Sequence, residues 1–472
     1  MPLSPVGYLP GRTTADLTDP TANCWVVAAL VQQTRQQGRG ELHLTSRGYC
    51  PQPRGGHAVS DHADVVVVGG GVQGAAVALH LLEAGVRDVL LLERDEPFEA
   101  TSGAGAGFVG IWAVAFPTFG KEEVAVEHYG INFYRRLQEQ GYDVDFAQNG
   151  FLFVGANEES LLGLRGMDRH PLDPDTHLVD GKRVEELTDG VILADEGIAG
   201  AYQPAGAHVY TKKVGAAMIA RISALGGRIE PRRPVTGLRV RGERIVGVET
   251  TTGAVSSDSV VLSAGAWNNE LLRPHGAFLP FVPLLTSRII TEPLGVPPSL
   301  PAVLLFGATS DAPVLWIRQH EGGLLWGGVY MNHPRDTLLG LDKLPTRFDE
   351  TPIDGVLECQ RAAAGASRFM PAFGRYRSMT LKHGAPCYTP DSRALVGSVP
   401  GIEGLYAIAG DNEGGITHGP GFGKALADHL VHGFSELTHL DAWQLDRFDG
   451  QYTTDVEVAA AVNADSVVQQ ET

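Results

Sequence analysis

Residues 64–74 read Asp-Val-Val-Val-Val-Gly-Gly-Gly-Val-Gln-Gly, and this stretch decides the fold. Its four valines form a short, continuous β-branched run, which predicts a strand buried on both faces of a parallel sheet. Gly69, Gly71 and Gly74 fill the three glycine positions of a dinucleotide-binding turn. The first permits a sharp turn, the second lets backbone approach a pyrophosphate, and the third lets the following helix pack closely on the strand.

The residues after this turn supply the rest of the motif. We expect a helix over about 75–84, whose N-terminal amides face the phosphates, and a second strand over 89–92. Glu93 directly follows that strand, and a carboxylate at this position accepts hydrogen bonds from an adenosine ribose. The motif in this context therefore predicts that the chain binds an adenine dinucleotide.

Three later segments favour a flavin dinucleotide over a nicotinamide one. Residues 101–107 form a second loop of small residues, and residues 260–267 read as a strand that ends in a small-residue turn. Residues 405–416 read as another strand that runs into a glycine-rich loop. We expect a helix from about 421 to 432 to follow, with its N-terminal dipole directed at the flavin edge that becomes negative on reduction.

With these segments in place, the chain resembles the D-amino-acid-oxidase-like superfamily of flavoproteins, and within it the flavin domain of dimethylglycine and sarcosine dehydrogenases. The resemblance covers about residues 62–435 and is carried by residues 316–328, by Thr389-Pro390-Asp391 and by residues 400–415. It implies an α/β plus α+β fold, in which a Rossmann-like FAD-binding domain is interleaved with an antiparallel-sheet substrate domain.

The alternation of segment types suggests how the two domains share the chain. We expect the FAD-binding domain at 63–150, 200–275 and 376–440, the substrate domain at 151–199 and 276–375, an arm or interface element at 1–62 and a tail at 441–472. Within them we expect strands at 285–291, 314–318 and 323–329, a helix at about 353–367, a possible short helix at 23–36, and a hairpin of 235–241 with 244–250.

Composition limits the partners. The net charge of −18 argues against nucleic acid or an anionic membrane surface and is compatible with a cationic substrate. Cys24, Cys50, Cys359 and Cys387 are scattered without a CxxC pair, so we expect no disulfide framework and no metal site. The longest N-terminal apolar run, residues 24–31, is too short for a membrane helix. These features predict a cytoplasmic protein and leave homo-oligomer formation open.

The predicted cofactor contacts come from all the glycine-rich segments. They are Gly69, Gly71, Val72, Gln73, Gly74, Glu93, Arg94, Thr101, Ser102, Gly105, Gly107, Val235, Ala264, Gly265, Trp267, Gly410, Asp411, Gly414, Gly415 and Ile416.

Departures from the family pattern concern the cofactor linkage and the electron acceptor. Where the dimethylglycine and sarcosine dehydrogenases carry a flavin-linked histidine, this chain has Ala104. Cys387 lies closer to Thr389 than the flavin-linked cysteine of monomeric sarcosine oxidases does, so we predict non-covalent FAD. Leu325 stands where those oxidases place a lysine that activates oxygen. The final acceptor, oxygen or an electron carrier, stays open.

Candidate catalytic residues are Asp411 and Glu413, in an acidic turn that the resemblance places along the flavin edge, and His383, ranked ahead of His418 for proton transfer. The alternative is that Glu413 faces solvent and Asp411 caps the turn. For the substrate carboxylate we single out Arg318. The other candidate cations are Arg288, on another predicted strand, and Arg377 and Lys382, on the strand that returns to the flavin. Trp326, Tyr330 and Tyr388, together with Trp112, are candidates for an aromatic wall, although each is as plausible in the core.

The resemblance implies an FAD-dependent oxidoreductase that oxidises a C–N bond of a small secondary amine or N-substituted amino acid by hydride transfer to flavin N5, giving an imine. The chain ends about forty residues after the last flavin motif, so we expect no folate-binding module in it. An FAD-dependent dehydrogenase of a 2-hydroxy acid or polyol uses the same fold and remains an alternative. A non-catalytic flavoprotein, or one completed by a partner, is the other.

Overall fold

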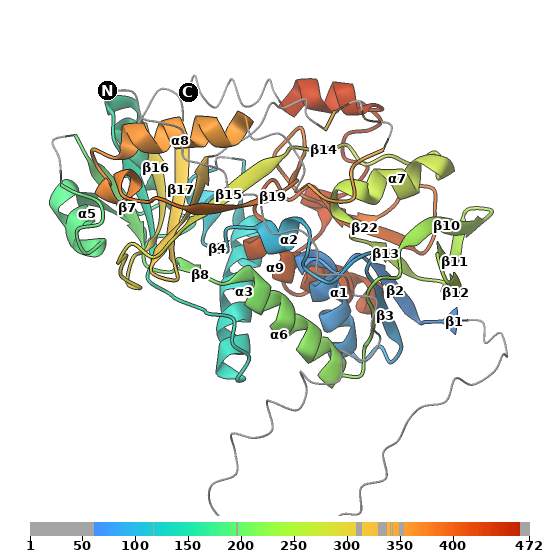
Figure 1. The fold of residues 1–472 in the computed structure, drawn as a ribbon. Helices are drawn as coiled ribbons and strands as arrows, with labels where there is room; N and C mark the ends of the chain where they lie inside the picture. The colour runs from blue at the N-terminus through green and yellow to red at the C-terminus, as the bar shows by residue number, and fades with distance from the viewer. Residues whose placement is uncertain are drawn as a thin grey trace, which may run out of the picture. The chain divides into compact units, whose positions relative to one another are not determined.

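A six-stranded sheet carries the glycine-rich segments, in the order β21-β22-β13-β2-β3-β9 (Figure 1). Its strands are parallel except β21, which pairs antiparallel with β22. They are β2 Val65–Val68, β3 Val89–Leu92, β9 Arg228–Glu230, β13 Val260–Leu262, β21 Leu395–Ser398 and β22 Leu405–Ala409. The predicted strands at 65–68 and 89–92 are confirmed, and both are buried along their whole length, as strands inside a parallel sheet must be.

The computed structural model describes residues 61–462, apart from 117, 195–196, 308–313, 329–337, 340, 342 and 349–353. The expected helix at 23–36, Cys24, Cys50 and Tyr330 lie outside the described residues. Residues 60–472 fall into one compact unit. Of the helices that the structure describes, none combines the length and the apolar character that a bilayer crossing needs.

Three helices pack together beside this sheet: α1 Val72–Glu83, α3 Lys121–Glu139 and α9 Gly415–His432. Helix α9 lies against both others, and glycines make the close approach possible. A Cβ on Gly423 would lie 2.5 Å from the Ala76 Cβ of α1. A Cβ on Gly130 of α3 would lie 1.9 Å from the Thr417 carbonyl oxygen of α9. Helix α6, Thr211–Ala224, packs on α1.

Helix α9 begins six residues earlier than the sequence suggested, at Gly415 instead of about 421. Proline in a helix interior has no N–H to donate to the carbonyl four residues before it, so Pro420 favours a later start. In the structure the Tyr134 hydroxyl donates to that carbonyl, on Ile416, at 2.7 Å. This tertiary hydrogen bond satisfies the acceptor that Pro420 leaves open, and His418 therefore lies in the first turn of a helix instead of in a loop.

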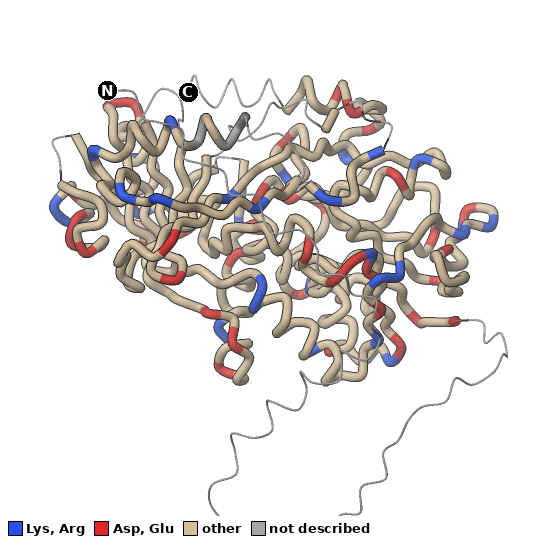
Figure 2. The backbone as a smooth tube through the Cα atoms, in the orientation of Figure 1, with Lys and Arg blue, Asp and Glu red and all other residues tan. Residues whose placement is uncertain are grey.

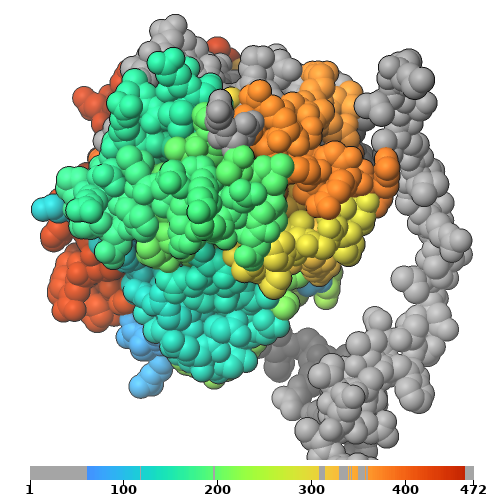
Figure 3. All heavy atoms as spheres, turned by 90° about the vertical axis from the view of Figure 1, so that its left-hand side faces the viewer, coloured from blue at the N-terminus to red at the C-terminus, as the bar shows by residue number. Residues whose placement is uncertain are grey.

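An eight-stranded sheet forms the second large layer, in the order β19-β15-β18-β17-β16-β5-β7-β6. All neighbouring pairs are antiparallel except β16 and β5. The strands are β5 Phe151–Gly155, β6 His177–Asp180, β7 Ala199–Gln203, β15 Thr286–Thr291, β16 Ala302–Phe306, β17 Val314–His320, β18 Gly323–Gly328 and β19 Met379–Gly384. Segments near 150–200 (green) therefore lie beside segments near 285–375 (yellow and orange) in Figure 3.

Strands β7 and β19 differ from the expected domain division. Both pair within the eight-stranded sheet, although residues 200–275 and 376–440 were assigned to the FAD-binding part. Helix α8, Asp354–Ala366, matches the helix expected at about 353–367 and supplies Ala362, Ala363 and Ala366 to the core on one face of this sheet (Figure 1). We retain the two-domain division, with these strands moved, as a proposal.

The expected hairpin is confirmed as β10 Val235–Arg241 and β11 Arg244–Thr250, which join β12 Gly253–Ser256 and β1 Asp61–His62 in a small sheet. The remaining elements are α2 Thr101–Ala104, α4 Glu158–Leu164, α5 Gly181–Leu187, α7 Asn268–Leu272, β4 Phe108–Val109, β8 Ala207–His208, β14 Val282–Pro283 and β20 Cys387–Tyr388. Acidic and basic residues are interspersed along the described chain (Figure 2).

Candidate active site

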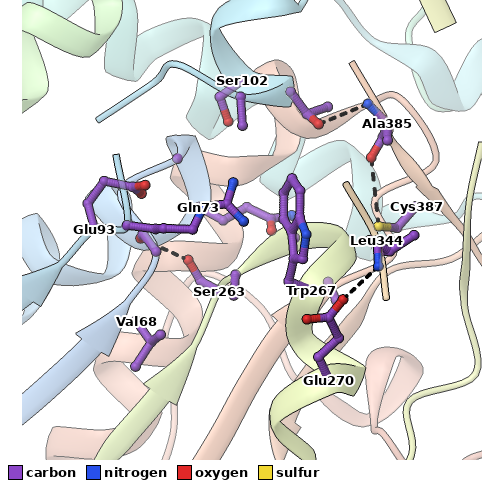
Figure 4. Close-up of a pocket in the computed structure, with 18 of the residues that line it drawn as sticks. Val68, Gln73, Glu93, Ser102, Ser263, Trp267, Glu270, Leu344, Ala385 and Cys387 are labelled. Atoms are coloured by element: carbon purple, nitrogen blue, oxygen red, sulfur yellow. Dashed lines mark hydrogen bonds between the residues drawn. The ribbon is translucent and has the colours of Figure 1, made fainter. Parts of the chain in front are cut away.

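Two connected cavities lie along the glycine-rich segments. The first, of about 390 Å³, follows the carboxyl ends of β2, β3 and β13 and the start of α1 (Figure 4). The second, of about 200 Å³, lies between the start of α9, the loop after α2 and strand β15. Val72, Ser102 and Asp411 line both cavities, so the two spaces form one elongated site.

The glycine turn between β2 and α1 is shaped by close backbone contacts. Gly69 has φ +107°, and a Cβ there would lie 2.3 Å from the Ser263 carbonyl oxygen of the neighbouring chain segment. A Cβ on Gly74 would lie 2.0 Å from the Gly69 carbonyl oxygen. Gly71 lines the first cavity, and its missing side chain leaves the backbone open toward that space. The three glycines thus occupy the positions that the motif demands.

The far end of the first cavity holds Glu93 and an aromatic stack. The Glu93 carboxylate accepts from the backbone N–H groups of Gly70 at 2.7 Å and Asp95 at 2.8 Å, which fixes it at the cavity edge. The Arg94 guanidinium lies 4.2 Å from the centre of the Trp267 ring, and Trp267 stacks on Phe348. Figure 4 shows Glu93, Ser102 and Trp267 around the same space.

Every predicted cofactor residue except Gly74 lines one of the two cavities. Gly69, Gly71, Val72, Gln73, Glu93, Arg94, Thr101, Ser102, Val235, Ala264, Gly265, Trp267, Gly410 and Asp411 line the first. Gly105, Gly107, Gly414, Gly415 and Ile416 line the second. Gly74 serves the packing of α1 on β2 instead, because its Cβ position is filled by the Gly69 carbonyl oxygen.

The two cavities fit the two halves of an FAD molecule. The first offers a ribose carboxylate and an open glycine turn, which suit the adenosine and pyrophosphate. The second is closed on one side by the first turn of α9, whose N-cap Gly414 makes no side-chain hydrogen bond to the helix amides. Unpaired amides and the positive end of an 18-residue helix suit the electron-rich edge of a flavin.

An acidic turn, Asp411-Asn412-Glu413, lies between β22 and α9 at the second cavity. Asn412 and Glu413 have φ +49° and +71°, a left-handed backbone that is uncommon for two consecutive non-glycine residues. The Asn412 side chain holds this turn, because it donates to the Gly410 carbonyl at 2.7 Å and accepts from the Thr389 N–H at 3.0 Å. The strained turn directs both carboxylates to the site.

Both carboxyl groups of this turn have raised pKa values. Asp411 accepts from the Gln73 amide at 2.9 Å, and burial raises its pKa to about 6, with the nearby His418 acting in the opposite direction. Glu413 exposes its side chain, and that side chain lines the cavity. The surrounding protein still raises its pKa to about 7, against a lowering effect of the Tyr388 hydroxyl. Both groups therefore titrate near neutral pH.

Arg288 lines the second cavity and Arg318 does not, so the structure favours Arg288 for the role that was predicted for Arg318. Arg288 donates to the Gly105 carbonyl at 2.6 Å, and its Nε has no hydrogen-bond partner. Burial lowers its pKa to about 10, so it stays cationic at neutral pH. Arg318 donates to the carbonyls of Ala106 and Gln319, which makes it a support of the loop beside the cavity.

Trp326 and His383 line neither cavity, and strand pairing places both on one face of the eight-stranded sheet. Side chains alternate between the faces of a strand, and directly paired residues share a face. Trp326 pairs with Ile317 in β17 and packs in the core beside α8, where its ring meets Phe373. His383 pairs with Ser287, whose hydroxyl lies 2.6 Å from its Nδ1, and it does not line the cavity.

The observed aromatic wall is built from other residues. Trp112, Phe116, Phe119 and Trp316 line the second cavity, whereas Tyr388 is buried in a small cluster and reaches the site only through Glu413. Trp316 was missed, although the alternation that places Trp326 away from the cavity also places Trp316 and Arg318 on the same face as each other. The alternation of side chains along the strand was the sequence signal that could have identified Trp316.

The residues that bear on covalent linkage also have clear positions. Ala104 lines the second cavity, where the family histidine was expected, and its side chain carries no nucleophile. Cys387 lines the first cavity, beside Ala385 and Pro386, and burial raises its thiol pKa well above the usual value. Leu325 is fully buried in the main core. In residues 61–462 as described, no group of three or more His, Cys, Asp or Glu side chains is placed to hold a metal ion.

Residues 64–429 match the family model described as FAD dependent oxidoreductase, and the chain belongs to this family. FAD is therefore its cofactor. Dimethylglycine dehydrogenase of Rattus norvegicus is 27% identical over 393 residues, which cover 79% of this chain and 43% of the relative. The 4-methylaminobutanoate oxidase (formaldehyde-forming) of Paenarthrobacter nicotinovorans is 30% identical over 403 residues, which cover 82% of this chain and 46% of that relative.

Among solved structures, the L-proline dehydrogenase from P. horikoshii is similar with a TM-score of 0.70 and 21% identity, over 83% of this chain and 99% of that one. This likeness shows the fold, a Rossmann-like FAD-binding part with a substrate sheet. The chain spans less than half the length of the two curated relatives named above.

Proposed function

We propose that the protein oxidises a C–N bond of a small secondary amine or N-substituted amino acid. The observation that carries this proposal is the lining of the second cavity, which offers a cation at Arg288, two carboxylates in the acidic turn and an aromatic wall. A zwitterionic amino acid has the complementary charges. Its carboxylate would pair with Arg288, and its ammonium with Asp411 or Glu413.

Arg288 is suited to hold a carboxylate because its charge is uncompensated. No carboxylate in the described part of the chain pairs with it, and its Nε is buried without a partner. An arginine offers two parallel N–H donors to a carboxylate, which fixes both position and orientation. The anchored substrate would then present its nitrogen to the acidic turn and its apolar substituent to Trp112 and Trp316.

FAD, when bound, accepts the hydride from the carbon beside the substrate nitrogen. The protein supplies position, exclusion of water and a proton acceptor, because an ammonium has no lone pair with which to expel a hydride. Asp411 and Glu413 favour the cationic amine in the site when ionised, through an attraction of the order of a few kcal/mol at intermediate dielectric. The product is an imine. The names of the dehydrogenase and oxidase relatives, which denote amine substrates, support this choice.

The first test is anaerobic reduction of the bound flavin by a panel of secondary amines, N-methyl amino acids and 2-hydroxy acids. We expect bleaching by N-methyl amino acids. Bleaching by hydroxy acids alone would favour the alternative dehydrogenase, and no bleaching by any compound would favour a flavoprotein completed by a partner.

The second test addresses Arg288 directly. Arg288→Met should raise the dissociation constant of an N-methyl amino acid at least about tenfold, because a hydrogen-bonded charge pair contributes about 1.5–3 kcal/mol. The corresponding amine without a carboxylate should bind equally well to both proteins. Arg239→Met serves as the control, because Arg239 is a half-buried strand residue that pairs with Glu249 and lines neither cavity. An equal loss of affinity for the N-methyl amino acid and for the amine without a carboxylate would contradict carboxylate recognition by Arg288.

A further inference from the structure

We propose that His418, held by Glu127, accepts the proton of the substrate ammonium at the second cavity. This inference rests on the proposed amine oxidation and names the group that prepares the amine for it. His418 lines the second cavity from the first turn of α9. Its Nε2 lies 3.1 Å from Glu127 Oε1, and Glu127, on α3, is fully buried.

The pairing of these two residues follows from the close contact of α3 and α9. A Cβ on Gly421 would lie 2.8 Å from the Val126 carbonyl oxygen, and one on Gly130 would lie 1.9 Å from the Thr417 carbonyl oxygen. The two helices therefore touch backbone to backbone on both sides of Glu127. At that separation the Glu127 carboxylate reaches the imidazole of His418.

The hydrogen bonds around Glu127 select the tautomer of His418. The second carboxylate oxygen, Oε2, accepts from the Ala113 N–H at 3.4 Å, so Glu127 acts as an acceptor there. When Glu127 is ionised, its Oε1 accepts from Nε2–H of His418, and this tautomer leaves the lone pair on Nδ1. A carboxylate that orients a histidine in this way also stabilises the imidazolium formed when Nδ1 takes a proton.

Nδ1 is open to the cavity because residue 414 is a glycine. A Cβ on Gly414 would lie 2.4 Å from Nδ1, and Gly414 itself lines the cavity. Nδ1 has no hydrogen-bond partner among the described residues. The imidazole is held edge-on to the Phe119 ring at 5.8 Å and lies against Phe422 at 5.6 Å, so it is fixed in position between two apolar side chains.

The charges that face His418 support proton uptake. Glu127 faces it from α3, Asp411 faces it from the acidic turn, and Gln73 of α1 contributes only a neutral amide. Glu413 and Arg288 lie on the same cavity. Burial raises the pKa of Glu127, which means that an isolated carboxylate is costly there, and a proton on His418 offsets this cost by forming a buried ion pair.

In the step itself, an N–H bond of the substrate ammonium breaks and an N–H bond forms at Nδ1. The electron pair stays on the substrate nitrogen, and the amine becomes neutral. No oxidation or reduction occurs in this transfer. Hydride loss to FAD follows as proposed above, and the imidazolium releases its proton to water when product leaves.

The test is the rate of anaerobic flavin reduction by an N-methyl amino acid as a function of pH, in holoenzyme with matched FAD content. At neutral pH, His418→Asn should reduce the rate by about 10²-fold or more, the usual contribution of a general base. The deficit should disappear as pH rises, because the free amine then enters already neutral. Glu127→Gln should give a smaller deficit with a shifted pH profile.

His80→Asn is the matched control, since His80 is also buried and paired with a glutamate, Glu83, at 2.9 Å, but faces away from both cavities. It should leave the profile unchanged. Gly414→Ala should lower the rate of flavin reduction at neutral pH as His418→Asn does, because the new methyl group would cover Nδ1. The hydrogen bond between His418 and Glu127 should stay intact. Nitrogen NMR of the wild-type protein labelled in its histidines should show His418 protonated at Nε2 and not at Nδ1, independently of activity.

Two outcomes would overturn the proposal while leaving amine oxidation intact. One is an equal rate for His418→Asn, or a deficit that is the same at every pH, since a structural role would lower the rate uniformly. The other is an Nδ1-protonated tautomer in the wild-type protein. Failure of the wild-type flavin to be reduced by any amine would instead reject the proposed function itself.

Discussion

At the residue scale, the glycine turn shows how a missing side chain creates a site. Gly71 has φ −77°, which any residue can adopt, so its importance is steric rather than conformational. A Cβ there would lie 2.8 Å from the Ser102 hydroxyl, which itself accepts from the Val72 N–H at 3.0 Å. A side chain at 71 would therefore displace this hydrogen bond and occupy the space of the first cavity.

Gly71→Val should produce apoprotein, or protein with at most a small fraction of the normal flavin content. The branched side chain would stand where backbone must approach the pyrophosphate. Absorbance at the flavin band per mole of purified protein measures the effect. Gly163→Val is the control, because Gly163 is exposed and an added Cβ meets nothing within 4 Å. A Gly71→Val protein with full flavin content would refute the assigned cofactor site.

The acidic turn makes a second prediction at this scale. The pKa of Asp411 is raised to about 6 and that of Glu413 to about 7, whereas both are roughly 4 in an unfolded chain. Between about pH 4 and pH 7 the folded apoprotein binds more protons than the unfolded chain. Its free energy of unfolding therefore decreases as the pH rises through this range. Asp411→Asn and Glu413→Gln should raise the melting temperature of the apoprotein at pH 8.

That gain should shrink as pH falls toward 5, because the wild-type carboxyls then become neutral as well. Differential scanning calorimetry of apoprotein across this range measures it. Glu249→Gln, at an exposed position on β11, is the control and should change little. A gain that did not depend on pH would contradict the raised pKa values of these two carboxyl groups.

The third prediction at this scale concerns the cofactor linkage, which we propose to be non-covalent. Ala104 has no nucleophile, and Cys387 lines the first cavity, with a thiol pKa that burial raises far above neutrality. Because the thiolate is the reactive form, this cysteine is poorly suited to attack a flavin. Acid precipitation should leave the yellow colour in the supernatant. Colour in the pellet would implicate Cys387, and Cys387→Ser would then be expected to release it.

At the element scale, α9 is the element on which the site depends most. Its first turn supplies Gly415, Ile416, Thr417 and His418 to the second cavity. The Thr417 hydroxyl accepts from the Trp112 indole at 3.0 Å, which fixes the aromatic wall to the helix. The early start of α9, supported by the Tyr134 hydrogen bond to Ile416, therefore places the proposed cofactor contacts, the wall and the proposed proton acceptor on one element.

Gly130→Ala tests the close packing of α3 on α9. The new Cβ would lie 1.9 Å from the Thr417 carbonyl oxygen, so the helices must separate. Overpacking of this kind costs about 1–3 kcal/mol, and we expect a lower melting temperature together with slower flavin reduction, since Glu127 would move away from His418. Gly163→Ala on exposed helix α4 is the control and should preserve or slightly raise stability. Equal stability of Gly130→Ala and wild type would contradict the backbone contact.

At the scale of the whole molecule, the proposed cofactor site joins the two large sheets. The first cavity belongs to the six-stranded sheet, whereas the second takes Thr286 and Arg288 from β15 of the eight-stranded sheet. Arg288 and Arg318 reach from that sheet to the carbonyls of Gly105 and Ala106. A ligand that spans both cavities should therefore stabilise both sheets together.

We expect FAD to raise the melting temperature of the apoprotein, and both sheets to melt in a single transition. A ligand present at 100 times its dissociation constant adds about 2.7 kcal/mol to the stability of the state that binds it. Thermal unfolding of apoprotein titrated with FAD measures the shift, and adenosine diphosphate is the control that fills only the first cavity. Two separate transitions with FAD bound would show that the sheets unfold independently.

The sequence by itself determined the features that depend on near neighbours in the chain. The strand at 65–68, the glycine turn and Glu93 are set by β-branched residues, by the absence of Cβ atoms and by spacing, and the structure has them where they were expected. Alternation along the two neighbouring strands also indicates that Trp326 and Arg318 point to opposite faces of the sheet. The family resemblance and the FAD site followed from these local patterns.

Only the tertiary structure decided which distant residues meet. Glu127 and His418 are 291 residues apart, and their hydrogen bond depends on two helices packed through glycines that look like ordinary small residues in the sequence. Helix α9 began earlier than expected because a tyrosine on α3 satisfies the carbonyl that Pro420 cannot. Arg288 lines the cavity, whereas Arg318 donates to the Ala106 carbonyl in the loop beside it. Such contacts arise from packing between segments far apart in the chain, and local propensity carries no record of them.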